Sequence, residues 1–542
     1  MGIGAKKIKK VFFSLMSSKH TGGTEIKSEI ERILSIHEGE DLASELLKYL
    51  ADYSGRIPRR VISIPGPEAI PIFADNIILL SDSYKVSHFV QYPPKTENVY
   101  SYFESRGGKF PEVEFFGLQY IIKRYFLGKV VTKEKIDEAE DYFKLHFGST
   151  RNFNRAGWEY ILEKYDGHLP ISIKAVPEGS VIPTHNVLVT CENTDPNCYW
   201  LTNFLETLIV QVWYPCTVAT NSRAQKLLIE KWFAETGCED IQSSIDFKLH
   251  DFGFRGVSSV ETSAIGGLAH LVNFKGTDTM SAFVCGRQYY NCEMAGYSIP
   301  ASEHSTITSW GKEGELDAFR NMLLQYPDGV VACVSDSWDV FNATKNFWGH
   351  ELRDLILQRH DGRLVIRPDS GDPPTVVVKC LELLGGPGGG FEPFITKTKT
   401  GHRLLPPQVR IIQGDAVCYE MIDKIYSAMA AAGWAADNVG FGSGGALLQQ
   451  MNRDTLKFAM KCASVVIDGQ EREVYKDPIT DPGKKSKRGR LALVRTSTGY
   501  ETVKQPELGA RRDELIEVFR NGKLLVDWSL EDIRNACTSV RI

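Results

Sequence analysis

Residues 364–372 read LVIRPDSGD, an apolar run that ends in charged and polar side chains and is followed at once by Pro373 and Pro374. Proline is favoured in the first turn of a helix, so the phrase predicts a strand, a polar loop and a helix in succession. The same order recurs in VVACVSDS at 330–337, VRIIQGDAV at 409–417 and NVGFGSGG at 438–445. Strands that alternate with helices in this way predict an α/β fold with a parallel sheet.

We interpret these phrases as β-α units of a barrel, in which the carboxyl ends of the strands bring polar side chains to one rim. KLHDFGFRG at 248–256 and NFKGTDT at 273–279 predict two more such units. The alternative is that all of them are ordinary strand-to-helix turns. Turns need Gly, Asn or Pro but do not need Arg367, Asp369 and Asp415, which favours a shared site.

A chain of 542 residues exceeds one compact core of ordinary size, and the sequence predicts four parts. These are an N-terminal extension, basic and then helical (1–73); an accessory α+β region whose N-terminal segment contacts substrate (74–240); the barrel core (241–460); and a C-terminal region with a basic loop, packed on the accessory domain (461–542). The extension carries five lysines and no acid within residues 1–24, which leaves a mitochondrial presequence open.

Composition narrows the class of protein. The net charge of -5 argues against a general nucleic-acid binder and favours small-molecule partners. The 11 cysteines include no C-x-x-C pair, which indicates neither a disulfide framework nor a structural zinc site and predicts the cytoplasm. No run of 18 uncharged apolar residues occurs, so no membrane span is expected.

The polar residues of the predicted rim suit a phosphorylated sugar. Asp369 and Asp415 offer acceptors for ribose hydroxyls, and the glycines of GSGG at 442–445 would let the backbone approach a phosphate. Cations for the phosphates are available in Arg255, Arg367, Arg453, Lys461 and the run KDPITDPGKKSKRGR at 476–490.

Two of these features have a simpler interpretation. A basic run such as 476–490 is usually a solvated loop, although its two Asp-Pro turns indicate an ordered one. His304 lies in the polar phrase PASEHSTITSW at 300–310, which is not a core helix face. A lone histidine is more often structural or merely exposed than catalytic, so both interpretations of His304 stay open.

A set of longer phrases resembles the nicotinamide phosphoribosyltransferase family in order and spacing. The phrases are SDSYKVSHFVQYPP, YILEKYDGHLPI, KAVPEG, ENTDPNCYWLTNFLETLIVQVWYP, KLHDFGFRGVSS, HLVNFKGTDT, ASEHSTIT, IRPDSGDP, IQGDAV and FGSGG. The likeness runs from about Asn76 to the last few residues. It implies a type II phosphoribosyltransferase, that is, a homodimer with an irregular α/β barrel and active sites at the subunit interface.

The resemblance also implies an activity, the transfer of a phosphoribosyl group from phosphoribosyl diphosphate to nicotinamide in NAD salvage. The pyridine would stack between Phe252 and Tyr84 of the partner subunit, and Asp278 would accept a hydrogen bond from the carboxamide. A carboxylate at that place would repel nicotinate. The structural alternatives are that Phe252 or Tyr84 is a plain core aromatic and that Asp278 caps a helix. The functional ones are a nicotinate-specific enzyme and a non-catalytic binding or signalling protein.

The remaining roles implied by the resemblance concern ribose, phosphates and ATP. They place Arg255, Arg367 and His304 at the diphosphate, Asp369, Gly414 and Asp415 at the ribose, Gly444, Gly445 and Arg453 at the 5′-phosphate, and Arg106, Lys461, Lys476 and Lys484 in a cationic shell, partly from the second subunit. Arg367 is also expected beside the pyridine. ATP would phosphorylate His304, with Asp339 as a supporting acid, and Mg²⁺ would arrive mainly with the diphosphate.

The sequence departs from the family pattern in three places. The segment after Arg106 is shorter than expected, Ala459 stands where a phosphate-facing serine is expected, and the N-terminal extension has no recognised counterpart. One lost neutral hydrogen bond costs about 0.5–1.5 kcal/mol, so the first two changes alter substrate affinity at most.

Overall fold

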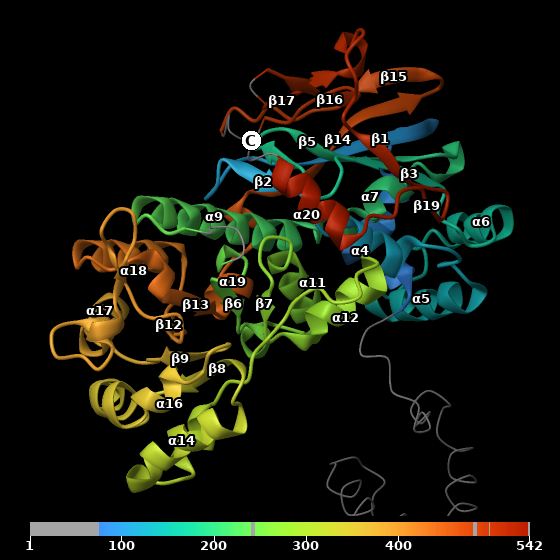
Figure 1. Cartoon of the computed structure of the whole chain (residues 1–542). Coiled ribbons are helices and arrows are strands. Elements are labelled where there is room, and N and C mark those ends of the chain that lie inside the picture. Colours follow the sequence, from blue (N-terminus) through green and yellow to red (C-terminus); the bar gives the residue numbers. More distant parts are fainter. Residues whose placement is uncertain (1–74, 240–243, 481–484, 498, 540–542) are drawn as a thin grey trace, which may run out of the picture. The chain divides into compact units, whose positions relative to one another are not determined.

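A computed structural model of the chain describes residues 75–239, 244–480, 485–497 and 499–539. The predicted extension at 1–73 therefore lies outside the described residues. Within residues 76–542, a parallel sheet and an antiparallel sheet lie on opposite sides of the long helix α9, Trp213–Glu235 (Figure 1). Helix α9 packs on α11 (Val260–His270) and α18 (Tyr419–Ala431) beside the parallel sheet.

Six strands form the parallel sheet, and the sequence predicted each of them. In spatial order they are β7 (Gly276–Thr277), β6 (Leu249–Asp251), β13 (Val439–Ser443), β12 (Val409–Gln413), β9 (Gly362–Arg367) and β8 (Gly329–Val334). Every neighbouring pair is parallel. Their carboxyl ends therefore lie along one rim.

A single extended segment, residues 297–302, closes this sheet. On one edge the Thr277 amide donates to the Tyr297 carbonyl at 2.9 Å, and on the other the Ala332 amide donates to the Pro300 carbonyl at 2.9 Å. Isolated parallel bridges join Tyr297 to Gly276 and Ala301 to Ala332. Both edge strands are thus hydrogen-bonded to the same segment, which makes the sheet an irregular barrel.

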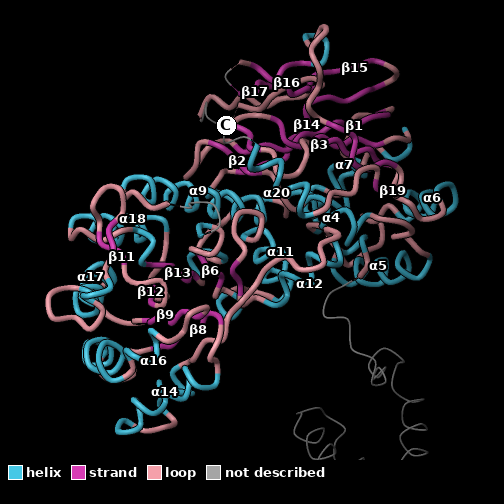
Figure 2. Tube along the Cα trace, in the orientation of Figure 1, coloured by secondary structure: helices cyan, strands magenta, loops and turns pink. Residues whose placement is uncertain are grey.

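Helices of the same half surround the parallel sheet or begin at its rim (Figure 2). They are α12 (Met280–Tyr289), α13 (His304–Thr308), α14 (Glu315–Gln325), α15 (Val340–Asn342), η7 (Ala343–Glu351), α16 (Arg353–Leu357), α17 (Pro373–Gly385) and α19 (Gly445–Leu448). Helix α17 begins at Pro373 as predicted, and the Asp372 side chain caps it by accepting from the Thr375 amide at 3.3 Å.

The antiparallel sheet joins segments that are far apart in the chain. Its strands, in spatial order, are β15 (Gln470–Glu473), β14 (Phe458–Ile467), β1 (Thr96–Ser105), β5 (Val187–Asn193), β3 (Ile171–Ala175), β18 (Ile516–Arg520) and β19 (Lys523–Leu524). Two-stranded sheets β2 (Glu112–Glu114) with β4 (Val181–Pro183), β10 (Thr396–Lys397) with β11 (Arg403–Leu404), and β16 (Leu491–Thr496) with β17 (Gly499–Lys504) complete the strands. Helices α5 (Lys133–His146), α6 (Arg155–Tyr165) and α20 (Leu530–Ser539) flank this half.

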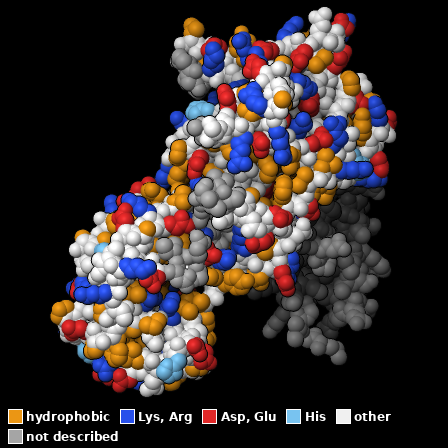
Figure 3. Space-filling model, turned by 45° about the horizontal axis from the view of Figure 1, so that its top comes forward, with side chains coloured by type: hydrophobic (Ala, Val, Ile, Leu, Met, Phe, Trp, Pro, Cys, Tyr) orange, Lys and Arg blue, Asp and Glu red, His pale blue; other side chains and the backbone are white. Residues whose placement is uncertain are grey.

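One continuous apolar core runs through both halves, with Trp158, Trp348 and Trp434 among its largest fully buried side chains. On the face in Figure 3, Lys and Arg side chains are interspersed with Asp and Glu. Among the described helices, none combines the length and apolar character needed to cross a membrane.

Candidate active site at the carboxyl rim of the barrel

The space above Gly414 brings three strand ends together. A Cβ atom on this glycine would lie 3.0 Å from Asp369 Oδ1, 3.6 Å from Arg367 Cδ and 3.7 Å from Phe252 Cε2. Gly414 follows β12, Arg367 and Asp369 lie at the end of β9, and Phe252 follows β6, so parallel pairing of the strands is what brings these residues together. Gly414 leaves room at this point that any side chain would fill.

The ring of Phe252 lies flat against the backbone of β13. The Phe252 amide donates to the Ser443 carbonyl at 2.9 Å, and a Cβ atom on Gly442 would lie only 1.9 Å from Phe252 Cε2. Beside it, the His250 ring has its centroid 5.0 Å away. Gly442 is therefore required for the place of the Phe252 ring.

Asp278 is held by two donors on one of its oxygens. His250 Nε2 lies 2.9 Å from Asp278 Oδ1, and the Ser298 hydroxyl donates to the same oxygen. Burial opposes ionisation, but the bonds from His250 and Ser298 and the charge of Arg367 lower the pKa of Asp278. The carboxylate is therefore ionised at neutral pH, and among the described residues no hydrogen bond reaches Oδ2.

Arg367 and Asp369 form a loose pair, with 4.0 Å between Arg367 Nε and Asp369 Oδ1. Arg367 Nε is buried and finds no hydrogen-bond partner among the described residues. Burial raises the pKa of Asp369, as do the charges of Asp336 and Asp415, while Arg367 and His304 oppose the rise. Acids and cations of four loops thus act on one another at this rim.

His304 opens α13 and its ring is about half exposed. Its Nε2 lies 2.9 Å from Oδ1 of Asp336, a carboxylate that follows β8. Asp339, the predicted supporting acid, instead accepts the amides of Phe341 and Asn342, each at 3.0 Å, and caps α15. The acid that contacts His304 in the structure is Asp336.

A second group of predicted residues gathers around Lys461 on β14. Burial lowers the pKa of Lys461, and the charges of Arg106, Lys476 and Arg453 lower it further, against the opposing effect of Glu206. The charges of three predicted phosphate-binding cations thus all act on Lys461.

The short segment after Arg106 folds as a glycine turn against the Arg453 segment. Gly107 and Gly108 have positive φ angles of 93° and 130°, and a Cβ atom on Gly108 would lie 2.2 Å from the Thr455 carbonyl oxygen. The Arg106 amide donates to the Lys457 carbonyl at 3.3 Å. The segment after Arg106 therefore lies against residues 455–457, which follow Arg453 in the chain, whereas Ala459 lies in the buried part of β14.

Hydrogen bonds and an ion pair hold the described parts of the basic run at 476–490. Lys476 and Ser486 exchange two hydrogen bonds, of 3.0 and 3.1 Å. The ammonium of Lys487 pairs with buried Glu104 on β1, and its amide donates to the Tyr102 hydroxyl at 2.8 Å. This favours the ordered-loop interpretation over a solvated loop. Lys484 lies outside the described residues.

The segment that carries Arg255 lies close to the glycines of GSGG. A Cβ atom on Gly256 would lie 3.8 Å from Gly445 Cα, and one on Gly444 would lie 3.5 Å from the Phe252 carbonyl oxygen. Arg255 is the central residue of η5 (Phe254–Gly256) and is exposed.

Among the described residues, no group of three His, Cys, Asp or Glu side chains is arranged to hold a metal ion.

Tyr84 is placed apart from Phe252. It lies on η2 (Ser83–Val90), is 60% exposed, and within the described chain its ring neighbour is His88, at 4.9 Å. The adjacent Lys85 pairs with Glu206 at 2.6 Å, and Glu206 also acts on Lys461. Tyr84 is thus linked to Lys461 only through the Lys85–Glu206 pair.

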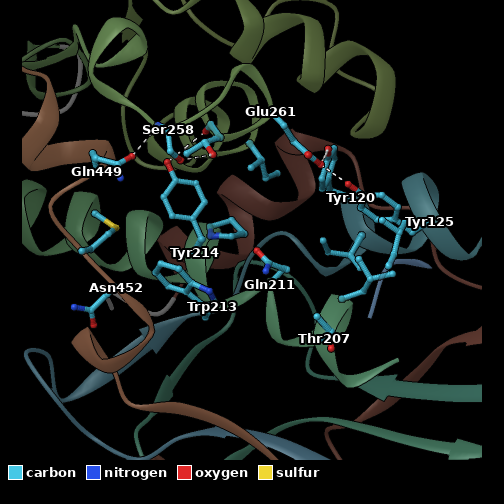
Figure 4. Close-up of a pocket in the computed structure, with 17 residues that line it drawn as sticks. Tyr120, Tyr125, Thr207, Gln211, Trp213, Tyr214, Ser258, Glu261, Gln449 and Asn452 are labelled. Atoms are coloured by element: carbon cyan, nitrogen blue, oxygen red, sulfur yellow. Dashed lines mark hydrogen bonds between the residues drawn. The ribbon is translucent and has the colours of Figure 1, made fainter. Parts of the chain in front are cut away.

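The structure also contains a cavity of about 580 Å³ (Figure 4). Tyr120, Trp213, Tyr214, Glu261, Gln449 and Asn452 are among the side chains that line it. Glu261 accepts the hydroxyls of Tyr120 and Tyr125 there. Asn452 precedes Arg453 in the chain, and a further lining residue, Leu80, lies just before η2.

Comparison with known proteins bears on this arrangement. Residues 247–523 match the profile of the nicotinate phosphoribosyltransferase (NAPRTase) family, and residues 76–173 match the nicotinamide phosphoribosyltransferase N-terminal domain. The nicotinamide phosphoribosyltransferase of Xanthomonas campestris pv. campestris (strain 8004) is 48% identical over 87% of this chain and all of its own length. The chain belongs to the nicotinamide phosphoribosyltransferase family.

Further comparisons agree with this membership. The nicotinamide phosphoribosyltransferase of Acinetobacter baylyi (strain ATCC 33305 / BD413 / ADP1) is 32% identical over 85% of this chain and 97% of its own. Two solved structures share the fold: nicotinate-nucleotide pyrophosphorylase from Pyrococcus furiosus (TM-score 0.56, 13% identity, 88% of this chain and 98% of that one) and human nicotinic acid phosphoribosyltransferase (TM-score 0.53, 16% identity, 85% and 93%). The predicted family and α/β fold class are confirmed.

Four residues of the rim were not predicted from the sequence. His250 and Ser298 bind Asp278, Asp336 binds His304, and Asp251 lies fully buried beneath Phe252. Alternation along β6 carried a signal for His250, since Leu249 and Asp251 are buried on one face and His250 lies on the other. For Ser298 there was no such signal, because it lies 20 positions from Asp278 in the chain.

Proposed function

We propose that this protein joins nicotinamide to the ribose of 5-phosphoribosyl 1-diphosphate, giving nicotinamide mononucleotide and diphosphate in NAD salvage. Membership of the family supports the reaction, and the ionised carboxylate of Asp278 beside the Phe252 ring supports the choice of pyridine. Its free Oδ2 would accept the carboxamide N–H₂, whereas the carboxylate of nicotinate would be repelled. Nicotinate-specific transfer is thereby disfavoured.

The reaction requires charge stabilisation rather than a protein nucleophile. As the bond between C1′ and the diphosphate oxygen breaks, positive charge grows on the ribose and negative charge on the leaving group, and the pyridine nitrogen forms the new bond to C1′. Arg367, with its unpaired buried Nε, and Arg255 would stabilise the leaving diphosphate. Asp369 and Asp415 would hold the ribose hydroxyls near Gly414, and Gly444, Gly445 and Arg453 the 5′-phosphate.

Mg²⁺ fits this donor set. Asp369 and Asp415 offer carboxylate oxygens of the kind that Mg²⁺ prefers. Burial raises the pKa of Asp369, and the charges of Asp336 and Asp415 add to the rise, so a cation beside these acids would be favoured. The substrate's phosphates would complete the ligand sphere. A bound Mg²⁺ would offset charge that develops on the diphosphate.

ATP would act through His304. In this proposal His304 accepts the γ-phosphoryl group of ATP on a ring nitrogen, with release of ADP, and the phosphohistidine promotes synthesis before water removes its phosphate. The hydrogen bond to Asp336 would orient the ring and select its tautomer, so that Asp336 takes the supporting role that the resemblance implied for Asp339. Asp339 would serve the same region by capping α15.

A homodimer with shared sites would bring Tyr84 to the pyridine. Within one chain the ring of Phe252 meets His250 rather than Tyr84, so the second face of the pyridine is left to a partner subunit. Exposed Val260 and Met280, at 63% and 67%, offer apolar surface near the rim for a second copy. All 11 cysteines are free, which suits the reducing cytoplasm.

The experiment is a paired assay of the wild type and Asp278→Asn. Purified protein is mixed with phosphoribosyl diphosphate, Mg²⁺, ATP and either nicotinamide or nicotinate, and the two mononucleotides are measured. The wild type should prefer nicotinamide strongly, and Asp278→Asn should lose most of this preference. Equal use of both pyridines by the wild type would refute the proposal. His304→Ala should abolish ATP hydrolysis coupled to synthesis yet keep a slow ATP-independent reaction, and full ATP stimulation would refute that part.

A further inference from the structure

Asp251 is a buried carboxylate for which the reaction described above has no use. It ends β6 with no exposed surface, directly before Phe252. Burial raises the pKa of Asp251, and hydrogen bonds oppose the rise. A buried carboxyl group disfavours folding unless it is hydrogen-bonded, so Asp251 requires partners for both of its oxygens.

One oxygen of Asp251 fixes the turn that carries Phe252. Oδ1 accepts the Gly253 amide at 2.7 Å, which closes a tight loop around Phe252. Phe252 itself donates from its amide to the Ser443 carbonyl. The backbone on both sides of the Phe252 ring is therefore anchored, once through Asp251.

The other oxygen and the main chain of Asp251 fix the loop that carries Asp278. Oδ2 accepts the hydroxyl of Thr277 at 3.3 Å, and that hydroxyl accepts the amide of Thr279 at 3.0 Å. The Asp278 amide donates to the Asp251 carbonyl at 2.9 Å. All three residues of Thr277-Asp278-Thr279 are thus bonded, directly or through one hydroxyl, to Asp251.

We propose that Asp251 is a positioning residue that sets the distance between the Phe252 ring and the Asp278 carboxylate, and through it the choice between nicotinamide and nicotinate. This inference rests on the proposed pyridine site. Because Asp251 joins the two groups through separate oxygens, losing it loosens the stacking face and the amide acceptor relative to each other. The ribose and 5′-phosphate residues (Asp369, Asp415, Gly444, Gly445 and Arg453) follow other strands and keep their places, whereas Arg255 follows Phe252 after the same strand.

The test measures kcat and KM for nicotinamide, nicotinate and phosphoribosyl diphosphate in Asp251→Asn, Asp251→Ala and Thr277→Val. The alanine variant should raise the KM for nicotinamide roughly tenfold, the scale of hydrogen bonds to a charged group. The KM for phosphoribosyl diphosphate should rise less, because only Arg255 among its proposed contacts follows the same strand. The preference for nicotinamide over nicotinate should fall in the same variant. Asparagine, which keeps an acceptor for the Gly253 amide, should restore part of both losses.

Asp437→Asn is the matched control. Asp437 is also a largely buried carboxylate of the barrel, but it pairs with Lys248 at 3.0 Å and Arg410 at 2.9 Å at the opposite, amino end of the strands. This variant should lower the melting temperature and leave the preference for nicotinamide as it is. If the Asp251 variants behave like Asp437→Asn, with lower stability and an unchanged preference, the inference is overturned.

Thr277→Val keeps the test open if the Asp251 variants fold poorly. It removes only the hydroxyl that links Asp251 to the Asp278 loop, and an unchanged preference in this variant overturns the inference on its own. Asp278→Asn separates the two levels of the argument. No change of preference in Asp278→Asn would refute the pyridine site itself, whereas a change there, with none at Asp251 or Thr277, refutes only the positioning role.

Discussion

His304 Nε2 lies 2.9 Å from Asp336 Oδ1, whereas the carboxylate of Asp339, three residues further on, is bonded to two amides of α15. Strand β8 ends just before Asp336, which turns toward the rim, and the chain has already entered the next helix at Asp339. Asp336 and Asp339, which look equivalent in sequence, therefore have different roles: the first binds His304 and the second caps α15.

Asp336→Asn should weaken the coupling to ATP. An asparagine can still meet the ring but cannot stabilise its positive charge, and hydrogen bonds to charged groups are worth about 1.5–3 kcal/mol, or roughly ten- to hundredfold in rate. Mononucleotide synthesis measured with and without ATP gives the stimulation ratio. A variant that keeps the wild-type ratio would show that Asp336 does not serve His304.

Asp339→Ala should instead lower stability. Loss of a helix N-cap costs about 1 kcal/mol, and this cost should appear as a lower melting temperature in thermal unfolding. The ATP stimulation ratio should stay near that of the wild type. A collapse of stimulation at unchanged stability would return the supporting role to Asp339.

Gly442→Ala should impair nicotinamide binding. The new methyl group would overlap the Phe252 ring at 1.9 Å, so the ring must move off the face of β13. Loss of one aromatic stack, worth about 0.5–1.5 kcal/mol, should raise the KM for nicotinamide roughly two- to tenfold. The KM for phosphoribosyl diphosphate reports whether the rest of the rim is intact.

Gly440→Ala is the control on the same strand. Its Cβ would meet only the Lys248 carbonyl oxygen, at 3.8 Å, which is an ordinary contact. Its KM for nicotinamide should match that of the wild type. Equal defects in the two variants would mean that β13 tolerates no side chain, and the argument about Phe252 would fail.

The barrel strands could be predicted because each is a local pattern, an apolar run with a polar end and a helix after it. Closure by residues 297–302 could not, since YSIPAS has no apolar run and its two partners, Gly276 and Ala332, lie on either side in the chain. The pairing of β1 with β14 joins residues more than 350 positions apart, and no local pattern specifies it.

The site divides in the same way. Asp278, Arg367 and Asp369 stand in strand-end phrases, so their place at the rim follows from parallel pairing. The partner of a given side chain does not: VVACVSDS contains Asp336, yet only the fold shows that it reaches His304. Tyr84 and Phe252 are a harder case, because one chain does not bring their rings together.

Glu104→Gln should loosen the basic loop and weaken binding of phosphoribosyl diphosphate. Glu104 is 3% exposed, and the substitution leaves the Lys487 ammonium without its charged partner, a loss of about 1–3 kcal/mol. The KM for phosphoribosyl diphosphate should rise while that for nicotinamide stays the same. Asp468→Asn is the control, because its pair with Lys95 is about two-thirds exposed on both sides and should contribute little.

Glu315→Gln should change how ATP coupling depends on pH. Burial raises the pKa of Glu315 to about 7, and the charges of Asp339 and Asp336 add to this, against Lys312. Its Oε1 is buried and meets no donor among the described residues. The group is therefore mostly neutral at pH 6 and mostly charged at pH 8.

The sign of the effect follows from where the charge appears. Because the folded pKa is raised above the ordinary value, the neutral form stabilises the fold at low pH, and this contribution is lost as the pH rises through 7. The new negative charge also acts on Asp336, the partner of His304, and would oppose the proposed transfer of an anionic phosphoryl group to that histidine. ATP stimulation should fall between pH 6 and pH 8 in the wild type and fall less in Glu315→Gln, whose side chain stays neutral. Parallel pH profiles for the two proteins would assign the titration to another group, because only Glu315 differs between them.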